Sequence, residues 1–202
     1  FNLGLARGLR RGGVATAQLV SPTVWAWRAG RVHTVARSVA DLLCLFPFEP
    51  ACYAGVDLRV HYVGHPLVRE LAEVPTRGQA REALGGDYPG PVIALLPGSR
   101  ASEVAQLGEV FLRAARLLAE RDPRRRFLLP AAGRERYAQL EAMLATAGMG
   151  DRVRLVSGQS REVMIAADAV LLASGTASLE AMLLRRPMVI AYRMAPLGFR
   201  LM

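Results

Sequence analysis

Short runs of apolar residues alternate along the chain with longer segments in which apolar residues recur every three or four positions. Runs rich in Val, Ile and Leu are typical of strands buried on both faces, whereas the three-to-four spacing is typical of helices with one buried face. The clearest helical pattern spans Ser102 to Arg121. Its apolar face consists of Val104, Leu107, Phe111, Ala114 and Leu118.

These patterns predict strands over residues 15–20, 41–46, 59–63, 91–96, 127–130, 153–156, 169–173 and 188–192. They predict helices over residues 31–40, 79–84, 102–121, 135–147, 161–167 and 176–184, with a proline-initiated helical turn over 47–54. Because strands and helices alternate, we expect parallel β-α-β units in an α/β fold. The alternation breaks between Gly64 and Pro91, a Gly- and Pro-rich stretch that we interpret as a connection between two lobes.

Composition narrows the class of protein. The chain has 202 residues, of which 52% are hydrophobic, so it can bury a core and is not a disordered tail. Every long apolar stretch carries charge, which excludes a membrane-spanning helix, and no signal peptide is visible at the start. The net charge is +9 and all 26 basic residues are Arg, which favours anionic ligands without choosing between nucleotide, nucleic acid and lipid.

The first candidate site is the turn LLPGSR at residues 95–100, between a predicted strand and the longest predicted helix. Free N–H groups and the positive dipole end of a helix gather at such a turn. Gly98, Ser99 and Arg100 could therefore cradle a phosphate. The alternative is an ordinary turn in which a serine caps the helix and the arginine is solvated.

The segment LLASGTASLE at residues 171–180 repeats this arrangement of strand, small-residue turn and helix. Ser174, Gly175 and Thr176 could form a second cradle. Glu180 could accept hydrogen bonds from the two hydroxyls of a ribose, or be a surface carboxylate near a helix start. Two such turns at the carboxyl ends of strands in one sheet define the crevice where open α/β folds bind nucleotides.

Two further segments carry weaker signals. The loop VSGQSR at residues 156–161 could offer Gly158 and Gln159 to a base edge, or be a plain loop. Trp25, Trp27 and Arg28 could form a platform for a sugar or an acyl chain, or at least one ring could pack in the core.

The histidines and cysteines predict no metal site. His33 and His61 have no partner at ligand spacing, and His65 stands alone in the connecting stretch, where a hinge or packing role is favoured. Cys44 and Cys52 match neither a metal motif nor a disulfide framework, so both are expected to be reduced core thiols.

Five segments together resemble one enzyme family. They are SPTVWAWRAGRV, LLCLFPFEPACY, YVGHPLV, IALLPGSRASEV and LLASGTASLEAMLLRRPMVIAYRM, in that family's order and spacing. On these segments the chain is similar to lipid-A-disaccharide synthases, over essentially all of its length. The resemblance implies two Rossmann-like lobes of GT-B type, each with a mostly parallel sheet flanked by helices.

The resemblance also implies an activity. Such an enzyme moves 2,3-diacylglucosamine from UDP-2,3-diacylglucosamine onto 2,3-diacylglucosamine 1-phosphate, which forms the β-1,6-linked lipid A disaccharide and releases UDP, with inversion and without a metal ion or other cofactor. It works in the cytoplasm, peripherally on the inner face of the inner membrane of a Gram-negative bacterium. Contact with anionic lipid is implied, a specific nucleic-acid partner is not, and a homodimer is left open.

Site residues follow from the resemblance only where motifs match. Arg100 matches an arginine that the family needs for activity and is assigned to the UDP diphosphate, where it would neutralise charge on the departing group. The other nucleotide-binding residues implied are Gly98, Ser99, Gly158, Gln159, Ser174, Gly175, Thr176 and Glu180, the last on the ribose. The acceptor and lipid side is expected to include Trp25, Trp27 and Arg28.

The chain departs from the family in length. Members are nearly twice as long, and both their acidic general base and the segment that completes the donor pocket fall outside these residues. Residues 1–66 then resemble the latter part of the N-terminal acceptor lobe, and residues 67–202 most of the C-terminal UDP-sugar donor lobe. We expect this chain, as an internal fragment, to bind nucleotide without turnover.

Two other functions stay open from the residues alone. One is a different UDP-N-acetylglucosamine-using enzyme of the same fold, either a transferase or an epimerase. It would differ from the first in lacking a dependence on acyl chains, whose burial contributes about 0.8 kcal/mol per CH₂. The other is a basic module that binds anions or a membrane surface, which the charge alone favours.

Overall fold

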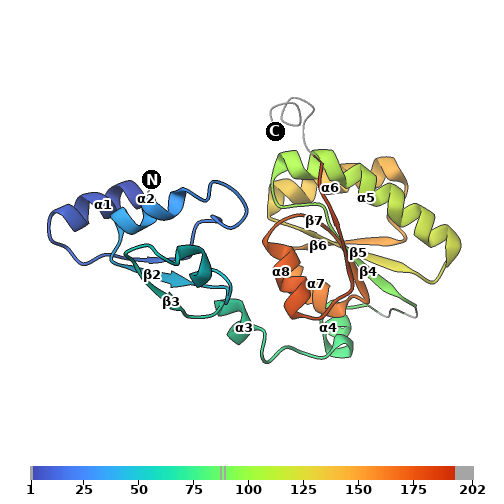
Figure 1. The fold of residues 1–202 in the computed structure, drawn as a ribbon. Coiled ribbons are helices and arrows are strands. Elements are labelled where there is room, and N and C mark those ends of the chain that lie inside the picture. The colour runs from blue at the N-terminus through green and yellow to red at the C-terminus, as the bar shows by residue number, and fades with distance from the viewer. Residues whose placement is uncertain (1, 87, 89, 194–202) are drawn as a thin grey trace. The chain divides into compact units, whose positions relative to one another are not determined.

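The computed structural model describes residues 2–86, 88 and 90–193, and it divides into two compact units. The units span Phe1–Glu70 and Leu71–Met202, each with its own parallel sheet (Figure 1). Helix α3 (Pro66–Glu70) belongs to the first unit, so the division falls after this helix, whereas the expected lobe boundary at residue 66 lies at its start.

The first unit is a three-stranded parallel sheet in the order β1-β2-β3. Its elements are α1 (Asn2–Arg11), β1 (Ala17–Leu19), α2 (Arg31–Ser38), β2 (Asp41–Cys44), the 3₁₀ helix η1 (Pro50–Tyr53) and β3 (Arg59–Tyr62). Its core contains the side chains of Val24, Val35, Val39, Leu42, Cys44 and Tyr53. Cys44 is fully buried as expected, whereas Cys52 is half-exposed and packs at the edge of this core.

The second unit is a five-stranded sheet in the order β6-β5-β4-β7-β8, and all neighbouring strands are parallel. Its strands are β4 (Val92–Leu96), β5 (Arg126–Ala131), β6 (Val153–Ser157), β7 (Ala169–Ala173) and β8 (Met188–Ala191). Its helices are α4 (Arg77–Ala83), α5 (Ala101–Arg121), α6 (Arg134–Ala147), α7 (Ser160–Ala166) and α8 (Thr176–Leu183). The predicted α/β fold, with mostly parallel sheets flanked by helices, is confirmed.

The strand order of the second unit places a topological switch beside β4. The chain builds outward from β4 through β5 to β6, then returns to place β7 on the other side of β4. Figure 1 shows α5 and α6 on one face of the sheet and α7 and α8 on the other. The helices that follow β4 and β7 therefore leave the sheet on opposite faces, which is the arrangement that opens a crevice at the carboxyl ends of the strands.

Pro130 ends the pairing between β4 and β5. The ladder stops at Ala94 and Leu128, although both strands continue. The Arg126 N–H donates to Pro91 on the β4 side at 3.0 Å, so the alternate residues 126, 128 and 130 turn their amides toward β4. Proline has no N–H to donate, and β5 continues to pair with β6 through Ala131. The sheet consequently parts between β4 and β5 at their carboxyl ends.

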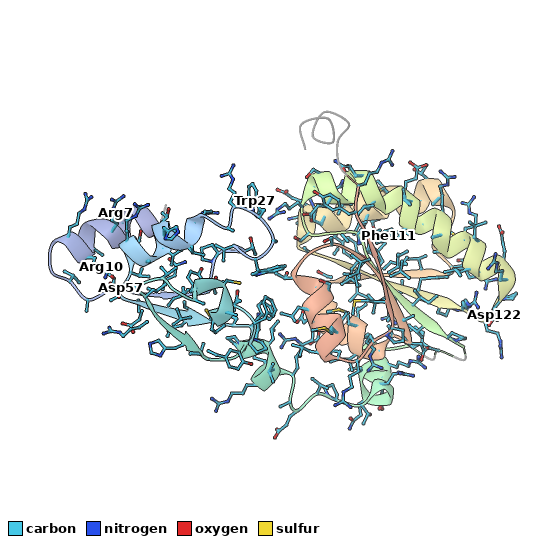
Figure 2. The ribbon with its side chains drawn as sticks, in the orientation of Figure 1. Arg7, Arg10, Trp27, Asp57, Phe111 and Asp122 are labelled. Carbon is cyan, nitrogen blue, oxygen red and sulfur yellow. The ribbon has the colours of Figure 1, made fainter. Side chains whose placement is uncertain are left out.

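The core of the second unit lies between the sheet and helices α5 and α6. Phe111, labelled in Figure 2, and Phe127 are its largest fully buried side chains. Gly108 brings the two helices close, because a Cβ there would lie 2.8 Å from the sulfur of Met143. Within the described residues, no helix has both the length and the apolar character needed to cross a membrane.

Candidate nucleotide site

A cavity of about 440 Å³ lies at the carboxyl ends of β4 and β7, where the topology switches. Its volume falls in the range of small-molecule sites. Its lining comes from the β4–α5 turn, the first turn of α5, the end of β5, the β6–α7 loop, and the β7–α8 turn with the first turns of α8. The lining residues used below are Gly98, Ser99, Arg100, Glu103, Pro130, Gly158, Ser174, Gly175, Thr176 and Glu180.

The β4–α5 turn, residues 97–100, depends on its glycine. Gly98 has a φ of +125°, a conformation that L-residues rarely adopt. A Cβ at this position would also lie 2.5 Å from both Cβ and Oε2 of Glu103. The turn can therefore keep its shape only with glycine here.

Glu103, and not a serine, caps helix α5. The N-cap residue is Arg100, and Oε2 of Glu103 accepts hydrogen bonds from the N–H groups of Ser99 at 3.0 Å and Arg100 at 3.1 Å. The hydrogen bond from the Arg100 N–H is the main reason that the pKa of the Glu103 carboxyl lies below its ordinary value. The alternative in which a serine caps this helix is wrong, because the glutamate one turn along folds back over the turn.

Arg100 reaches from the turn into solvent at the mouth of the cavity. Its side chain is 81% exposed, and Nη1 donates to Oε1 of Glu103 at 2.9 Å. A guanidinium in this position can donate further hydrogen bonds to an anion, since only one of its N–H groups is engaged in the described contacts.

The β7–α8 turn supplies the opposite wall. Gly175 is the N-cap residue of α8 and has an extended φ of 167°, and no described side chain caps this helix start. The Ser178 hydroxyl donates to the Gly175 carbonyl at 2.6 Å, which fixes the first turn. The leading amides of the helix thus lack a side-chain acceptor, as in helix starts that bind anions.

Glu180 is held at the cavity by an arginine that the sequence analysis did not assign. Its side chain is 19% exposed, and Oε1 accepts a hydrogen bond from Nε of Arg161 at 3.0 Å. Glu180 is therefore not a solvated surface carboxylate. Arg161 lies at the start of α7, directly after the β6–α7 loop. The sequence could have indicated this residue only through its position near the end of a predicted strand.

The third loop contributes one of its two predicted residues. Gly158, with a φ of +65°, lines the cavity. Gln159 has a left-handed φ of +54°, forms the N-cap of α7 and is exposed outside the cavity lining. Pro130 and Glu103 also line the cavity and were missed, because neither residue type signals ligand contact until the chain is folded.

The predicted aromatic platform lies in the first unit, where Figure 2 labels Trp27. Trp25 is 51% exposed and packs edge-on against Phe48 with ring centroids 5.4 Å apart. Trp27 is 57% exposed, and the Arg28 guanidinium lies 4.3 Å from its ring centroid. The alternative that one of these rings packs in the core is wrong, because both side chains are exposed.

Histidine and carboxylate side chains do not gather into a metal centre in the described part of the chain. No group of three His, Cys, Asp or Glu residues there is placed to hold a metal ion. Asp41 instead forms an ion pair with Arg59 at 2.6 Å and a hydrogen bond with Nε2 of His61 at 2.9 Å.

Comparisons with known proteins agree with this geometry. The model of the family described as lipid-A-disaccharide synthetase matches residues 1–202. The chain is 54% identical over 195 residues to the lipid-A-disaccharide synthase of Chromohalobacter salexigens, covering 96% of this chain and 50% of that protein. It is 50% identical over 203 residues to that of Aromatoleum aromaticum, covering 100% of this chain and 52% of that protein. The chain thus spans about half the length of the curated relatives that it matches.

A solved structure supports the fold. The sucrose-phosphate synthase of Thermosynechococcus elongatus superposes with a TM-score of 0.51 and 19% identity, over 96% of this chain and 50% of that one. At this identity the likeness concerns the fold alone.

Proposed function

The chain belongs to the lipid-A-disaccharide synthetase family, and from this premise we propose that its second unit carries the UDP-sugar site of a glycosyltransferase. The proposed reaction transfers 2,3-diacylglucosamine from UDP onto 2,3-diacylglucosamine 1-phosphate. The 6-hydroxyl oxygen of the acceptor attacks C1 of the donor, the bond from C1 to the diphosphate breaks, and the hydroxyl proton leaves to a base. UDP leaves with the electron pair of the broken bond.

One observation carries this proposal: two strand-end turns, one with Arg100 and one followed by Glu180 on α8, line the same cavity. Arg100 is proposed to bind the diphosphate, where its fixed positive charge stabilises the departing oxygen. Gly98, Ser99 and the uncapped start of α8 at Gly175 and Thr176 would add N–H donors to the phosphates.

Glu180 is proposed to bind the ribose. An ionised carboxylate can accept two hydrogen bonds from vicinal hydroxyls, and the Arg161 contact restricts its rotation, which supports that geometry. Gly158 is proposed to lie along the uracil edge, and Gln159 to act there only if the ligand draws the loop inward. No metal or other cofactor is proposed to take part.

The first unit is proposed to face the acceptor and the lipid. Trp25, Trp27 and Arg28 offer aromatic faces and a cation to a phosphorylated, acylated sugar. Helix α1 exposes Leu5 and Leu9, together with several arginines, and each arginine near an anionic membrane would add about 1 kcal/mol of attraction. A peripheral location on the inner face of the inner membrane is proposed on this basis.

The test is a calorimetric titration of UDP into the 202-residue chain and its variants. Hydrogen bonds to charged groups contribute about 1.5–3 kcal/mol, so Arg100→Ala and Glu180→Ala should each weaken UDP binding by about 10- to 100-fold. The matched controls are Arg113→Ala and Glu109→Ala, which remove the same charges from exposed positions on α5. These controls should leave the dissociation constant within about twofold, since exposed charges far from the site contribute little.

Two results would count against the proposal. If UDP binds and neither Arg100→Ala nor Glu180→Ala weakens it, the residue assignment is wrong. If the unsubstituted chain does not bind UDP at all, the second unit does not form a UDP-sugar site by itself, and the proposed role of this chain fails.

A further inference from the structure

The Glu103 carboxylate already accepts hydrogen bonds from the N–H donors of the β4–α5 turn. Its Oε2 accepts hydrogen bonds from the N–H groups of Ser99 at 3.0 Å and Arg100 at 3.1 Å. Its Oε1 accepts a hydrogen bond from Nη1 of Arg100 at 2.9 Å. Two backbone amides and a guanidinium at a helix start are the donor set that binds a phosphate group. The chain therefore supplies its own anion at the point where a diphosphate would bind.

The local geometry is built around this contact. Gly98 leaves room for the carboxylate, because a Cβ there would lie 2.5 Å from Oε2. The hydrogen bonds that Glu103 accepts keep the pKa of its carboxyl below the ordinary value, so it carries a full negative charge at neutral pH. The Glu103 carboxylate thus places a negative charge in the cavity lining, beside the positive charge of Arg100.

A diphosphate cannot use the same donors while the carboxylate stays. Each backbone N–H donates one good hydrogen bond, and two anions at neighbouring positions repel. The ligand must therefore displace the carboxylate or bind beside it against this repulsion. Either course lowers affinity relative to the same turn without a carboxylate.

We propose that Glu103 is an internal competitor that a nucleoside diphosphate displaces from the amides of Ser99 and Arg100. The ligand's identity rests on the proposed function, whereas the competition itself concerns any diphosphate. In the empty protein the carboxylate caps α5, and when the diphosphate leaves, the carboxylate returns to the same amides. Glu103 therefore weakens the hold on UDP and favours its release after transfer.

A purely structural role predicts the opposite result. If Glu103 only caps α5, its removal loosens the turn and leaves diphosphate binding equal or weaker. If Glu103 is a competitor, its removal frees the N–H groups of Ser99 and Arg100 for the ligand. Diphosphate binding then becomes tighter, even though the helix loses its cap. The direction of the affinity change separates the two roles.

The experiment titrates UDP and inorganic pyrophosphate into the 202-residue chain and into Glu103→Gln. Glutamine keeps the side-chain length and one acceptor oxygen but loses the charge. We expect Glu103→Gln to bind both probes about tenfold or more tighter, since a like charge beside the phosphates is removed. The control Glu109→Gln removes a carboxylate from an exposed position on the same helix and should change both affinities by less than about twofold.

A second measurement leaves the chain unsubstituted and so does not depend on how a variant folds. The ¹³C resonance of the Glu103 carboxyl carbon is followed as pyrophosphate is added. We expect it to move as the two amide hydrogen bonds are lost. A resonance that stays in place at saturation overturns the inference.

The outcomes also separate this inference from the proposed function. If UDP binds, Arg100→Ala weakens it and Glu103→Gln does not tighten it, the inference fails and the proposed function stands. If no form binds UDP but Glu103→Gln tightens pyrophosphate, the competition stands and the proposed function fails. Pyrophosphate binding that is absent from both forms overturns the inference.

Discussion

Glu49 shows how one buried carboxylate can shape a turn. Its side chain is 3% exposed, and Oε2 accepts the N–H groups of Leu45 and Phe46, both at 2.9 Å, just after β2 ends. A carboxylate out of water is costly unless its lone pairs are used, and here two backbone amides use them. The turn that carries Phe46 and Phe48 therefore depends on this residue.

Glu49→Ala should lower the free energy of unfolding of the first unit by about 2 kcal/mol or more, because two N–H groups lose their acceptor inside the protein. Glu49→Gln should cost less, since the amide oxygen can still accept. Urea unfolding followed by tryptophan fluorescence measures both effects, because Trp25 and Trp27 lie in this unit. Asp57→Ala, at an exposed position of the same unit, serves as the control, and a loss as large in that variant would contradict the argument.

The two cysteines should differ in reactivity. Burial raises the pKa of the Cys44 thiol to about 11, with a smaller contribution from the nearby Glu49 carboxylate, whereas Cys52 is half-exposed. Since the thiolate is the reactive form, iodoacetamide at pH 8 should modify Cys52 and leave Cys44 unmodified. Peptide mass mapping checks this result, and modification of both thiols in urea provides the control. Equal labelling of the two in the folded chain would show that Cys44 is accessible.

Single residues also show how far the sequence could anticipate the cavity. Gly98, Arg100 and Glu180 stand at strand ends in small-residue turns, and a strand end is a feature that the hydrophobic pattern reveals. Glu103 could not be found in this way, because its role depends on a side chain that folds back over the turn. The strand-end position of Arg161 did not reveal its contact with Glu180 on another helix. Charged side chains on helices are usually solvated, so their type alone gave no signal.

At the scale of elements, helix α5 joins the cavity to the core. Its apolar face packs on the sheet through Phe111, and its first turn is fixed by the Glu103 carboxylate. The pKa of this carboxyl is lowered in the folded chain, chiefly by the Arg100 N–H. A lowered pKa means that the contact stabilises the fold above the ordinary pKa of 4.5, and that this stabilisation is lost as the pH falls through the lowered value.

The thermal midpoint of the second unit should therefore depend on Glu103 only at higher pH. At pH 6 we expect the unsubstituted chain to melt above Glu103→Gln, because the charged cap is present. By pH 3 the difference should shrink as the carboxyl protonates. Circular dichroism melts at both values measure this change. A difference that stays constant with pH would mean that the charge of the cap does not contribute to stability.

The hydrophobic pattern located most elements but not all of them. Every predicted strand is present, with ends that differ by a few residues. Helices α1 and α3 were not among the predicted elements. In α1, Gly4, Gly8 and several arginines interrupt the apolar spacing, and α3 is too short for periodicity to be visible. The parting of β4 from β5 was also unforeseen, because it follows from which side of the strand the Pro130 nitrogen faces.

At the scale of the molecule, each unit has its own core and its own sheet. Both tryptophans of the chain lie in the first unit, whereas the cavity lies in the second. Unfolding of the two units can therefore be observed separately. Tryptophan fluorescence reports the first unit alone, and far-ultraviolet circular dichroism reports both.

Saturating UDP should shift only one of these signals. A ligand that binds the folded second unit stabilises it by mass action, so the urea midpoint measured by circular dichroism should rise. The midpoint measured by tryptophan fluorescence should stay within error. Equal shifts of both midpoints would show that the two units unfold as one. The control is uridine at the same concentration, which lacks the diphosphate and should shift neither midpoint appreciably.

The parting of the sheet at Pro130 has a consequence for how this site could be redesigned. Where small side chains create the space in a pocket, one enlarging substitution can close it. Here part of the opening arises because β4 and β5 stop pairing, with a proline where the next amide donor would be. The residues around the opening can then vary without sealing it. A designer who wishes to change what the cavity accepts would vary other lining residues and leave both this proline and Gly98 untouched.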